Sequence, residues 1–202
     1  MTHAVENVEA FLPLIEKADV LAVGPGLGQN DWGQTLYDCA IESGKALILD
    51  ADALNLLAEN PQPLPQAILT PHPGEAARLL GVSNQAIQAH RFDAMDALVE
   101  KYQCVIVLKG AGTLVGAPGE TTRVIDAGNP GMATGGTGDV LAGMIAAWCG
   151  QLLDPATACQ LAVYLHGRAG DLAAADEGEV AMIAGDVVDR LGDAVLELTT
   201  DK

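Results

Sequence analysis

The chain has 202 residues, of which 50% are hydrophobic and only 3% are aromatic. A chain of this length buries about 70% of its unfolded surface in one core, and a core of small aliphatic side chains suits helices packed on a buried parallel sheet. The 27 acidic and 10 basic residues give a net charge of −17, which excludes broad binding to nucleic acid or to an anionic membrane.

The amino terminus has no basic segment followed by an apolar one, and no apolar run is long enough to span a membrane. The sequence therefore predicts a cytoplasmic protein that binds neither nucleic acid nor a membrane. None of its cysteines forms a C-x-x-C pair or a metal-type cluster with histidine. We interpret all four as small hydrophobic core residues and predict no metal ligands in the chain.

The predicted elements alternate between short apolar strands and amphipathic helices, which is typical of β-α-β units. In the first half we expect strands at residues 19–23, 46–49 and 67–69, and helices at 31–43, directly after Asp52, and at 85–102. In the second half we expect a strand at 105–108, a β excursion at 114–125, and helices at 140–149, 155–174 and 184–191. The excursion turns at Pro118-Gly119, and Pro155 suits the first turn of its helix.

Unusual loops directly follow the carboxyl ends of these strands. Their sequences are GPGLG, DADA, TPHPGE, KGAGT and, opening a later helix, GTGD. In open α/β sheets, ligands bind in the crevice at that edge. We therefore expect these loops to form one site.

The clearest of these loops is Gly135-Gly136-Thr137-Gly138-Asp139. Its glycines allow the backbone to approach a ligand closely, and the free N–H groups at a helix start attract anions. We predict a phosphate cradle here, with Asp139 as the general base that accepts the proton of an attacking hydroxyl. The alternative is a flexible turn in which Asp139 caps the helix.

Two further loops carry candidate side chains. The segment Lys109-Gly110-Ala111-Gly112-Thr113 suits close passage beside a flat or phosphorylated ligand, or else begins a hairpin with a solvated lysine. Prolines on both sides of His72 stiffen its loop, so we favour a functional histidine there over a buried, hydrogen-bonded structural one. For Glu75 we favour the helix dipole alone as the explanation.

Three other features have weaker interpretations. GPGLG lacks the G-x-G-x-x-G spacing of a dinucleotide fingerprint, although its backbone could still approach a ligand. Asp50 and Asp52 could hold a metal ion or a water molecule, but we favour caps of the following helix. We expect His166, on an alanine-rich helix, to be structural.

Taken in order, the segments GPGLG, LDADALNLL, TPHPGEAARLLG, VLKGAGTLV, GNPGMATGGTGDVLAG and YLHGRAGDLAA resemble the ADP- or ATP-dependent NAD(P)H-hydrate dehydratases. These enzymes form the carboxyl-terminal, ribokinase-like domain of a bifunctional repair enzyme. The resemblance extends from about residue 19 to residue 189. It implies a three-layer α/β/α fold with a mostly parallel central sheet, as one domain over residues 1–202. Relative to the family we expect the chain to be truncated, without the family's amino-terminal strands and the substrate contact that they carry.

The resemblance also implies an activity and its cosubstrates. The added hydroxyl of hydrated NADH or NADPH would be phosphorylated by ADP or ATP with Mg²⁺, giving AMP from ADP, and phosphate would then be eliminated. Gly26, His72 and Asp139 would bind the hydrated nicotinamide, while residues 109–113 and the cradle 135–138 would bind the nucleotide. A homo-oligomer is implied, together with an epimerase domain or protein that acts on the same substrate.

Two other functions fit part of the sequence. A ribokinase-like kinase for a hydroxymethylpyrimidine, a thiazole or a sugar would share GTGD but would not require TPHPGE or GNPGMATGG. A non-catalytic nucleotide-binding subunit would fit the late start of the chain relative to the family, but it would not require Asp139.

Overall fold

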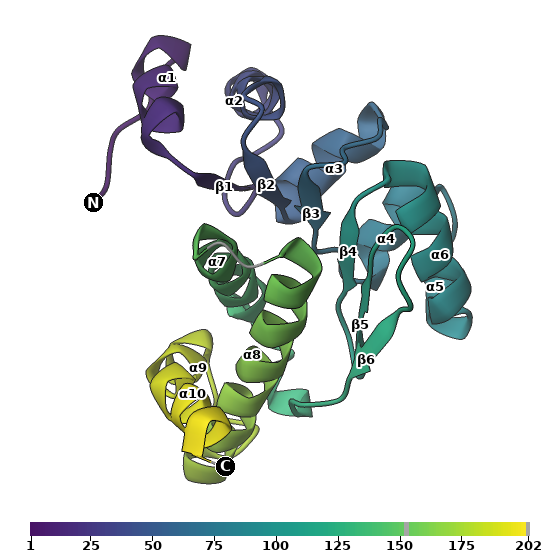
Figure 1. The fold of residues 1–202 in the computed structure, drawn as a ribbon, viewed down its shortest axis with the longest axis vertical. Helices are drawn as coiled ribbons and strands as arrows, with labels where there is room; N and C mark the ends of the chain where they lie inside the picture. Colours follow the sequence, from purple (N-terminus) through teal and green to yellow (C-terminus); the bar gives the residue numbers. More distant parts are fainter. Residues whose placement is uncertain (152–153, 201–202) are drawn as a thin grey trace.

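The computed structural model describes residues 1–151 and 154–200, and its centre is a six-stranded sheet in the order β1-β2-β3-β4-β5-β6 (Figure 1). The first four strands are parallel, whereas β5 and β6 run antiparallel to their neighbours. The strand bounds are β1 Val20–Val23, β2 Ala46–Leu49, β3 Ala67–Leu69, β4 Val105–Leu108, β5 Thr113–Gly116 and β6 Arg123–Ile125. Four parallel strands thus end at one edge, where the predicted loops follow them.

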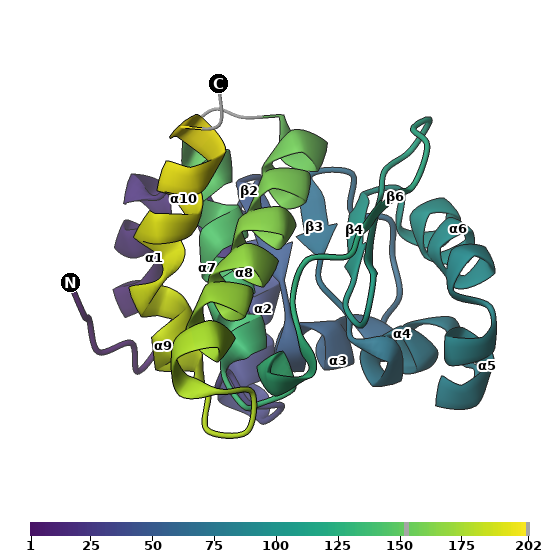
Figure 2. The same ribbon diagram turned by 90° about the horizontal axis from the view of Figure 1, so that it is seen from below.

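Helices cover both faces of the sheet, with α2 to α6 on one side and α7 and α8 on the other (Figure 1). Helices α9 and α10 pack against α8 outside this layer (Figure 2). The helix bounds are α1 Val8–Lys17, α2 Asp31–Glu42, α3 Ala51–Glu59, α4 Pro73–Leu80, α5 Asn84–Ala89, α6 Arg91–Tyr102, α7 Thr137–Gly150, α8 Pro155–Glu177, α9 Ala184–Asp189 and α10 Leu191–Thr200, with a 3₁₀ turn η1 at Pro130–Met132.

Alternate residues of the strands pack into the two helical layers. On β2, Leu47 and Leu49 join the core formed with α2 to α6, whereas Ile48 joins the core formed with α7 and α8. Because side chains of a strand alternate between its faces, an unbroken apolar run marks a sheet that is covered on both sides. This arrangement confirms the three-layer α/β/α fold and the mostly parallel sheet.

One helix prediction was wrong, and helices near the two ends of the chain were missed. The helix expected at residues 85–102 is two helices, because the backbone of His90 leaves the helical region (φ −136°, ψ 57°). This break allows Ile87 of α5 and Met95 of α6 to be buried in the same core. Helix α1, which contains Pro13, was not predicted. Helix α10 was also missed, because the predicted helix at residues 184–191 ends where α10 begins, after Arg190.

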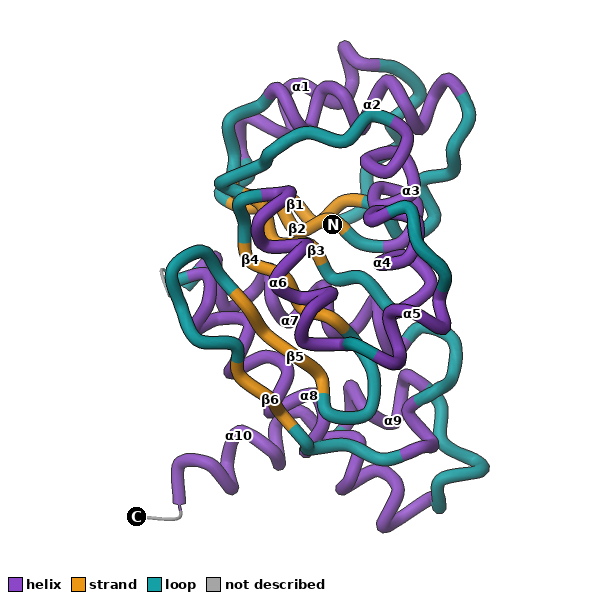
Figure 3. The backbone as a smooth tube through the Cα atoms, turned by 90° about the vertical axis from the view of Figure 1, so that its right-hand side faces the viewer, coloured by secondary structure: helices purple, strands orange, loops and turns teal. Residues whose placement is uncertain are grey.

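The second half otherwise follows the expected pattern. The excursion forms β5 and β6, a two-stranded ribbon beside β4 (Figure 3), and Gly119 turns between them with a φ of 77°. Helix α7 begins at Thr137, three residues earlier than expected, because its first turn belongs to the glycine-rich loop rather than to the apolar pattern. No helix in residues 1–151 and 154–200 is long and apolar enough to cross a membrane.

The loop after β1 crosses the end of β2 at backbone contact. Gly24 has a φ of +132°, and a Cβ atom there would lie 1.7 Å from the carbonyl oxygen of Asp50. A side chain at this position is therefore blocked both by backbone conformation and by a rigid neighbour. The contact fixes the GPGLG loop against the residue that follows β2.

We expect Gly24→Ala to lower the free energy of unfolding by about 3 kcal/mol or more, because the methyl group would push two backbone segments apart. Gly44→Ala is the matched control, since Gly44 also has positive φ (+69°) but no atom within 4 Å of the added Cβ. Its cost should be only about 1 kcal/mol, the strain of a left-handed alanine. Denaturant unfolding of both variants measures this difference, and equal losses would contradict the backbone contact.

Candidate active site

A cleft of about 820 Å³ lies at the carboxyl edge of the sheet, a volume that suits a nucleotide-sized ligand. The loops after β4 and β6 form two of its walls, and the starts of α4 and α7 and the middle of α8 complete it. The residues that line it are His72, Pro73, Lys109, Gly110, Ala111, Gly112, Thr113, Asp126, Ala127, Gly128, Asn129, Pro130, Met132, Ala133, Thr134, Thr137, Gly138, Leu141, Val163, His166 and Gly167.

The start of α7 opens onto this cleft without a cap. Gly136 occupies the N-cap position with a φ of 92°, and no side chain caps the helix. The first-turn N–H groups are therefore available to an anion, and the helix dipole adds partial positive charge. Asp139 is exposed and lies inside the first turn, so the alternative in which it caps the helix is wrong.

The loop that leads into α7 is held by a threonine. The Thr137 hydroxyl is buried and donates towards the carbonyl oxygens of Met132 and Thr134, at 2.8 and 2.9 Å. A hydroxyl shared between two carbonyl groups draws the loop back on itself. The glycines that follow Thr134 are thereby held at the start of the helix.

A buried ion pair lies beside this cradle. Lys109, which follows β4, donates from Nζ to Asp50 Oδ1, which follows β2, across 2.7 Å. Asp50 is only 2% exposed and the lysine side chain 18% exposed. A Cβ atom at Gly138 would lie 3.3 Å from the same Nζ. The positive charge therefore lies next to the cradle, and the alternative of a solvated Lys109 is wrong.

The expected cap at Asp50 is also wrong. Asp50 occupies the N-cap position of α3, but its side chain makes no cap hydrogen bond and binds Lys109 instead. Asp52 accepts from the backbone N–H of Gly28 at 2.9 Å, so it ties down the GPGLG loop rather than capping α3. Asp50 thus connects the end of β2 to the loop after β4, and Asp52 connects α3 to the loop after β1.

A second carboxylate approaches the lysine from α4. Glu75 Oε2 lies 3.9 Å from Lys109 Nζ, and the side chain is almost fully buried. Burial raises the pKa of Glu75, while Lys109, the backbone N–H of His72 and its imidazole oppose the rise. The lysine charge is thus compensated by nearby carboxylates in the protein as it stands.

His72 and Glu75 form one structural unit. The imidazole Nδ1 accepts from the Gly74 N–H at 2.9 Å, and Glu75 Oε2 accepts from the His72 N–H at 2.8 Å. This reciprocal arrangement is a capping box at the start of α4. The imidazole is held by this cap and remains half exposed where it lines the cleft, so its role in ligand binding stays a prediction.

The structure brings most of the predicted site residues into one cleft. His72, residues 109–113, Thr137 and Gly138 line it. Gly135, Gly136, Gly26 and Asp139 do not line it, although the first two and Asp139 adjoin it along the chain. A Cβ atom at Gly26 would meet nothing within 4 Å among the described residues, so that loop presents an open backbone.

Sequence reasoning missed two contributions from α8. Asp171 accepts from the Gly128 N–H and from Asn129 Nδ2, each at 3.1 Å, and so anchors the cleft loop after β6. His166 lines the cleft at 8% exposure, and its Nε2 has no hydrogen-bond partner among residues 1–151 and 154–200. Burial lowers the pKa of His166 to about 4, against a hydrogen bond to the Thr137 backbone, so the ring is neutral at pH 7. The segment YLHGRAGD contains both residues and was the available signal.

The site has no ready-made metal cluster. In the part of the chain that the structure describes, no group of three or more His, Cys, Asp or Glu side chains could hold a metal ion. Any divalent cation would therefore depend on oxygen atoms of the ligand for most of its coordination. Magnesium commonly binds in this way, through phosphates and one or two carboxylates.

Comparison with known proteins shows the family to which the chain belongs. The family model described as NAD(P)H-hydrate dehydratase matches residues 1–192. The bifunctional NAD(P)H-hydrate repair enzyme of Coxiella burnetii is 47% identical over 95% of the chain, and that of Escherichia coli is 45% identical over 100%. The chain covers 39% of each of these relatives.

Solved structures share the fold. The ADP/ATP-dependent NAD(P)H-hydrate dehydratase of Bacillus subtilis, co-crystallised with ATP and Mg²⁺, superposes with a TM-score of 0.80 at 34% identity. The match covers 89% of this chain and 64% of that one. The hydroxyethylthiazole kinase of Pyrococcus horikoshii has a TM-score of 0.73 at 18% identity, with 96% and 77% covered, and shares the fold alone.

Replacement of Gly138 should close the cradle. Gly138→Val adds side-chain atoms beside Lys109 Nζ, where the first-turn N–H groups face an anion, and we expect it to weaken ADP and ATP binding by about tenfold or more. Gly143→Val in the same helix is the control, because a Cβ atom there meets nothing within 4 Å. Titration calorimetry measures both variants, and unchanged affinity in Gly138→Val would show that the cradle assignment is wrong.

Proposed function

Because the chain belongs to the NAD(P)H-hydrate dehydratase family, we propose that it converts hydrated NADH or NADPH back to the reduced cofactor at the expense of ADP or ATP. The observation that carries the proposal is the uncapped start of α7 beside the Lys109 ammonium, in a cleft large enough for a nucleotide. The resemblance of the motifs to this family supports the same activity.

The nucleotide phosphates bind at the cradle in this proposal. The free N–H groups of the α7 first turn and of residues 110–112 supply donors, and Lys109 supplies one compact positive charge. Phosphoryl transfer needs chiefly positioning and charge stabilisation. In a chain with a net charge of −17, backbone donors can provide these without a cluster of cations.

Asp139 prepares the nucleophile. Its carboxylate accepts the proton of the added ring hydroxyl, whose oxygen then attacks the terminal phosphorus of ADP or ATP. The bond to the bridging oxygen breaks, which releases AMP from ADP or ADP from ATP. The carbon–oxygen bond of the phosphorylated ring then breaks, the neighbouring ring carbon loses a proton, and the double bond that forms between the two carbons restores the reduced nicotinamide as phosphate departs. Phosphate leaves more readily than hydroxide, which accounts for the use of a nucleotide in a dehydration.

Mg²⁺ would enter with the phosphates and neutralise their charge when bound. Among the described residues, Asp126, which lines the cleft, and Asp139, in the first turn of α7, are exposed carboxylates suited to support it. Asp50 and Glu75 are less suited because they are engaged with Lys109. The chain's own residues otherwise bind, orient and deprotonate the substrate.

The hydrated nicotinamide would lie between Gly26, His72 and Asp139. Gly26 offers an open backbone in a loop that Asp52 holds, and His72 is fixed by its cap with half of its imidazole exposed. A pre-ordered loop and imidazole lose little freedom when a ligand binds. The ring hydroxyl would then face Asp139 at the start of α7.

The assembly around this domain is also a proposal. The curated relatives are named bifunctional repair enzymes, and the chain spans about two fifths of their length. We propose that an epimerase domain or protein acts on the same hydrated substrate, and that the domain forms a homo-oligomer. The word bifunctional in the names of the relatives supports the first proposal, and the resemblance of the motifs to the family implies the second.

The direct test is an absorbance assay in the reduced-nicotinamide band, with the purified chain, hydrated NADH or NADPH, and ADP or ATP. Recovery of reduced cofactor, dependent on nucleotide, supports the proposal. Accumulation of a stable phosphorylated product would indicate a kinase of the same fold instead. Nucleotide binding without turnover would indicate a non-catalytic subunit.

Asp139→Asn keeps the size of the side chain and removes the base, so we expect turnover to fall by about 10²–10⁴-fold. Nucleotide affinity, measured by calorimetry, should change little because the amide groups of the cradle remain. Asp193→Asn is the control, another exposed aspartate in the first turn of a helix, but of α10, none of whose residues lines the cleft, whereas Thr137, Gly138 and Leu141 of α7 do. Near-normal turnover in Asp139→Asn would remove this residue from its proposed role.

A further inference from the structure

The guanidinium group of Arg91 lies behind the loop 109–113. Arg91 begins α6, and its Nη2 donates to the carbonyl oxygens of Leu108 and Gly112 at 3.2 and 3.0 Å. These two carbonyl groups stand at the two ends of the loop that joins β4 to β5. A single nitrogen atom therefore bridges the two ends of the loop through hydrogen bonds.

The fit between the guanidinium and the loop is tight. A Cβ atom at Gly110, whose φ is +143°, would lie 2.3 Å from Arg91 Nη1. Arg91 is not among the residues that line the cleft. It therefore supports the loop from the side opposite the ligand and does not itself reach the cleft.

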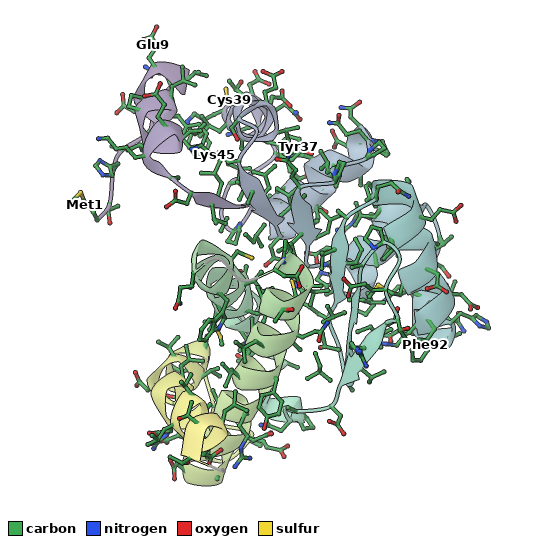
Figure 4. All side chains as sticks on the ribbon, viewed as in Figure 1. Met1, Glu9, Tyr37, Cys39, Lys45 and Phe92 are labelled. Carbon is green, nitrogen blue, oxygen red and sulfur yellow. The ribbon has the colours of Figure 1, made fainter. Side chains whose placement is uncertain are left out.

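The needs of helix α6 do not explain an arginine at this position. A cation in the first turn of a helix is unfavourable, because the helix dipole is positive there. The next residue of the helix, Phe92, labelled in Figure 4, is 56% exposed, so its side chain lies outside the core that Met95 joins. The contact with the loop is what compensates the unfavourable placement.

Three carbonyl groups along the loop accept hydrogen bonds, whereas the amide groups at positions 110–112 have no partner among the described residues. Besides the two bonds from Arg91, the Thr113 hydroxyl donates to the carbonyl oxygen of Gly110 at 3.0 Å. The backbone N–H of Lys109 donates to Pro71. Within the described residues, the N–H groups of positions 110–112 have no partner. Carbonyl groups held on one side leave unpaired N–H groups on the cleft side, which is the arrangement that an anion requires.

We propose that Arg91 is a positioning residue of the nucleotide site, which holds residues 109–113 so that their free N–H groups face the phosphates. This inference rests on the proposed function, because the loop is assigned to the nucleotide there. The two N–H groups of Nη2, held in the plane of the guanidinium, serve the two carbonyl acceptors at once, and a lysine ammonium at the end of a flexible chain does so less well.

Arg91→Met removes both hydrogen bonds and keeps much of the side-chain length, and Arg91→Lys keeps the charge. Arg78→Met is the control, an arginine of α4 that hydrogen-bonds the Asn55 side chain outside the cleft. Two readouts are needed: amide hydrogen exchange of residues 110–112 without nucleotide, and ADP affinity by calorimetry. Kinetics with the hydrated cofactor then separates the KM for nucleotide from kcat.

We expect Arg91→Met to speed exchange in the loop and to weaken ADP binding by about 10- to 100-fold, the usual effect of losing charge-assisted hydrogen bonds. The KM for nucleotide should rise in parallel, while kcat at saturating nucleotide and the KM for hydrated cofactor stay within about threefold. Arg91→Lys should be intermediate, and Arg78→Met should match the wild type in both readouts.

Unchanged exchange and unchanged ADP affinity in Arg91→Met would overturn the inference and leave the proposed function standing. Equal weakening of nucleotide and hydrated-cofactor binding would also overturn it, because that result indicates general loosening of the fold. If the wild-type protein bound neither ADP nor ATP, the proposed function would fail, and the inference with it.

Discussion

The site depends on the buried contact between Lys109 Nζ and Asp50 Oδ1. It joins the ends of β2 and β4 across β3, and it places an ammonium group beside the position where Gly138 begins the cradle. A buried ammonium without a partner is costly, so the carboxylates of Asp50 and Glu75 are what allow a positive charge at this edge. Asp50 and Lys109 are 59 positions apart in the sequence, and they meet because the sheet places the ends of β2 and β4 close together.

The arrangement separates two tasks. Buried charges and loop anchors, such as Asp52 on the GPGLG loop and Asp171 on the loop after β6, keep the edge of the sheet rigid. Within the described residues, the backbone N–H groups of the cradle and the exposed carboxylate of Asp139 are left available to a ligand. In our proposal the first bind phosphate and the second removes a proton, so recognition of an anion by a strongly acidic protein needs only one nearby cation.

Sequence patterns predicted the sheet well, because residues 46–49, 67–69 and 105–108 are apolar runs bounded by turn residues, and the strands coincide with them. The loops at the strand ends were located for the same reason. The roles of Asp50 and Glu75 were not predictable, because each depends on a partner brought close only by the fold. The pattern of neighbouring residues favoured a helix cap for Asp50 and a dipole effect for Glu75. The same kind of pattern predicted one helix through His90, but the packing of α5 and α6 into the core breaks the helix there.

The most direct test of the central contact is a double-mutant cycle on Asp50 and Lys109, with stability and ADP affinity measured separately. Each single variant, Asp50→Asn or Lys109→Met, should lower the free energy of unfolding by about 3 kcal/mol, because one buried charge is left without its partner. Our account predicts that the double variant regains most of this stability but not ADP affinity, since the ammonium beside the cradle is gone. A double variant that binds ADP as tightly as the wild type would contradict it.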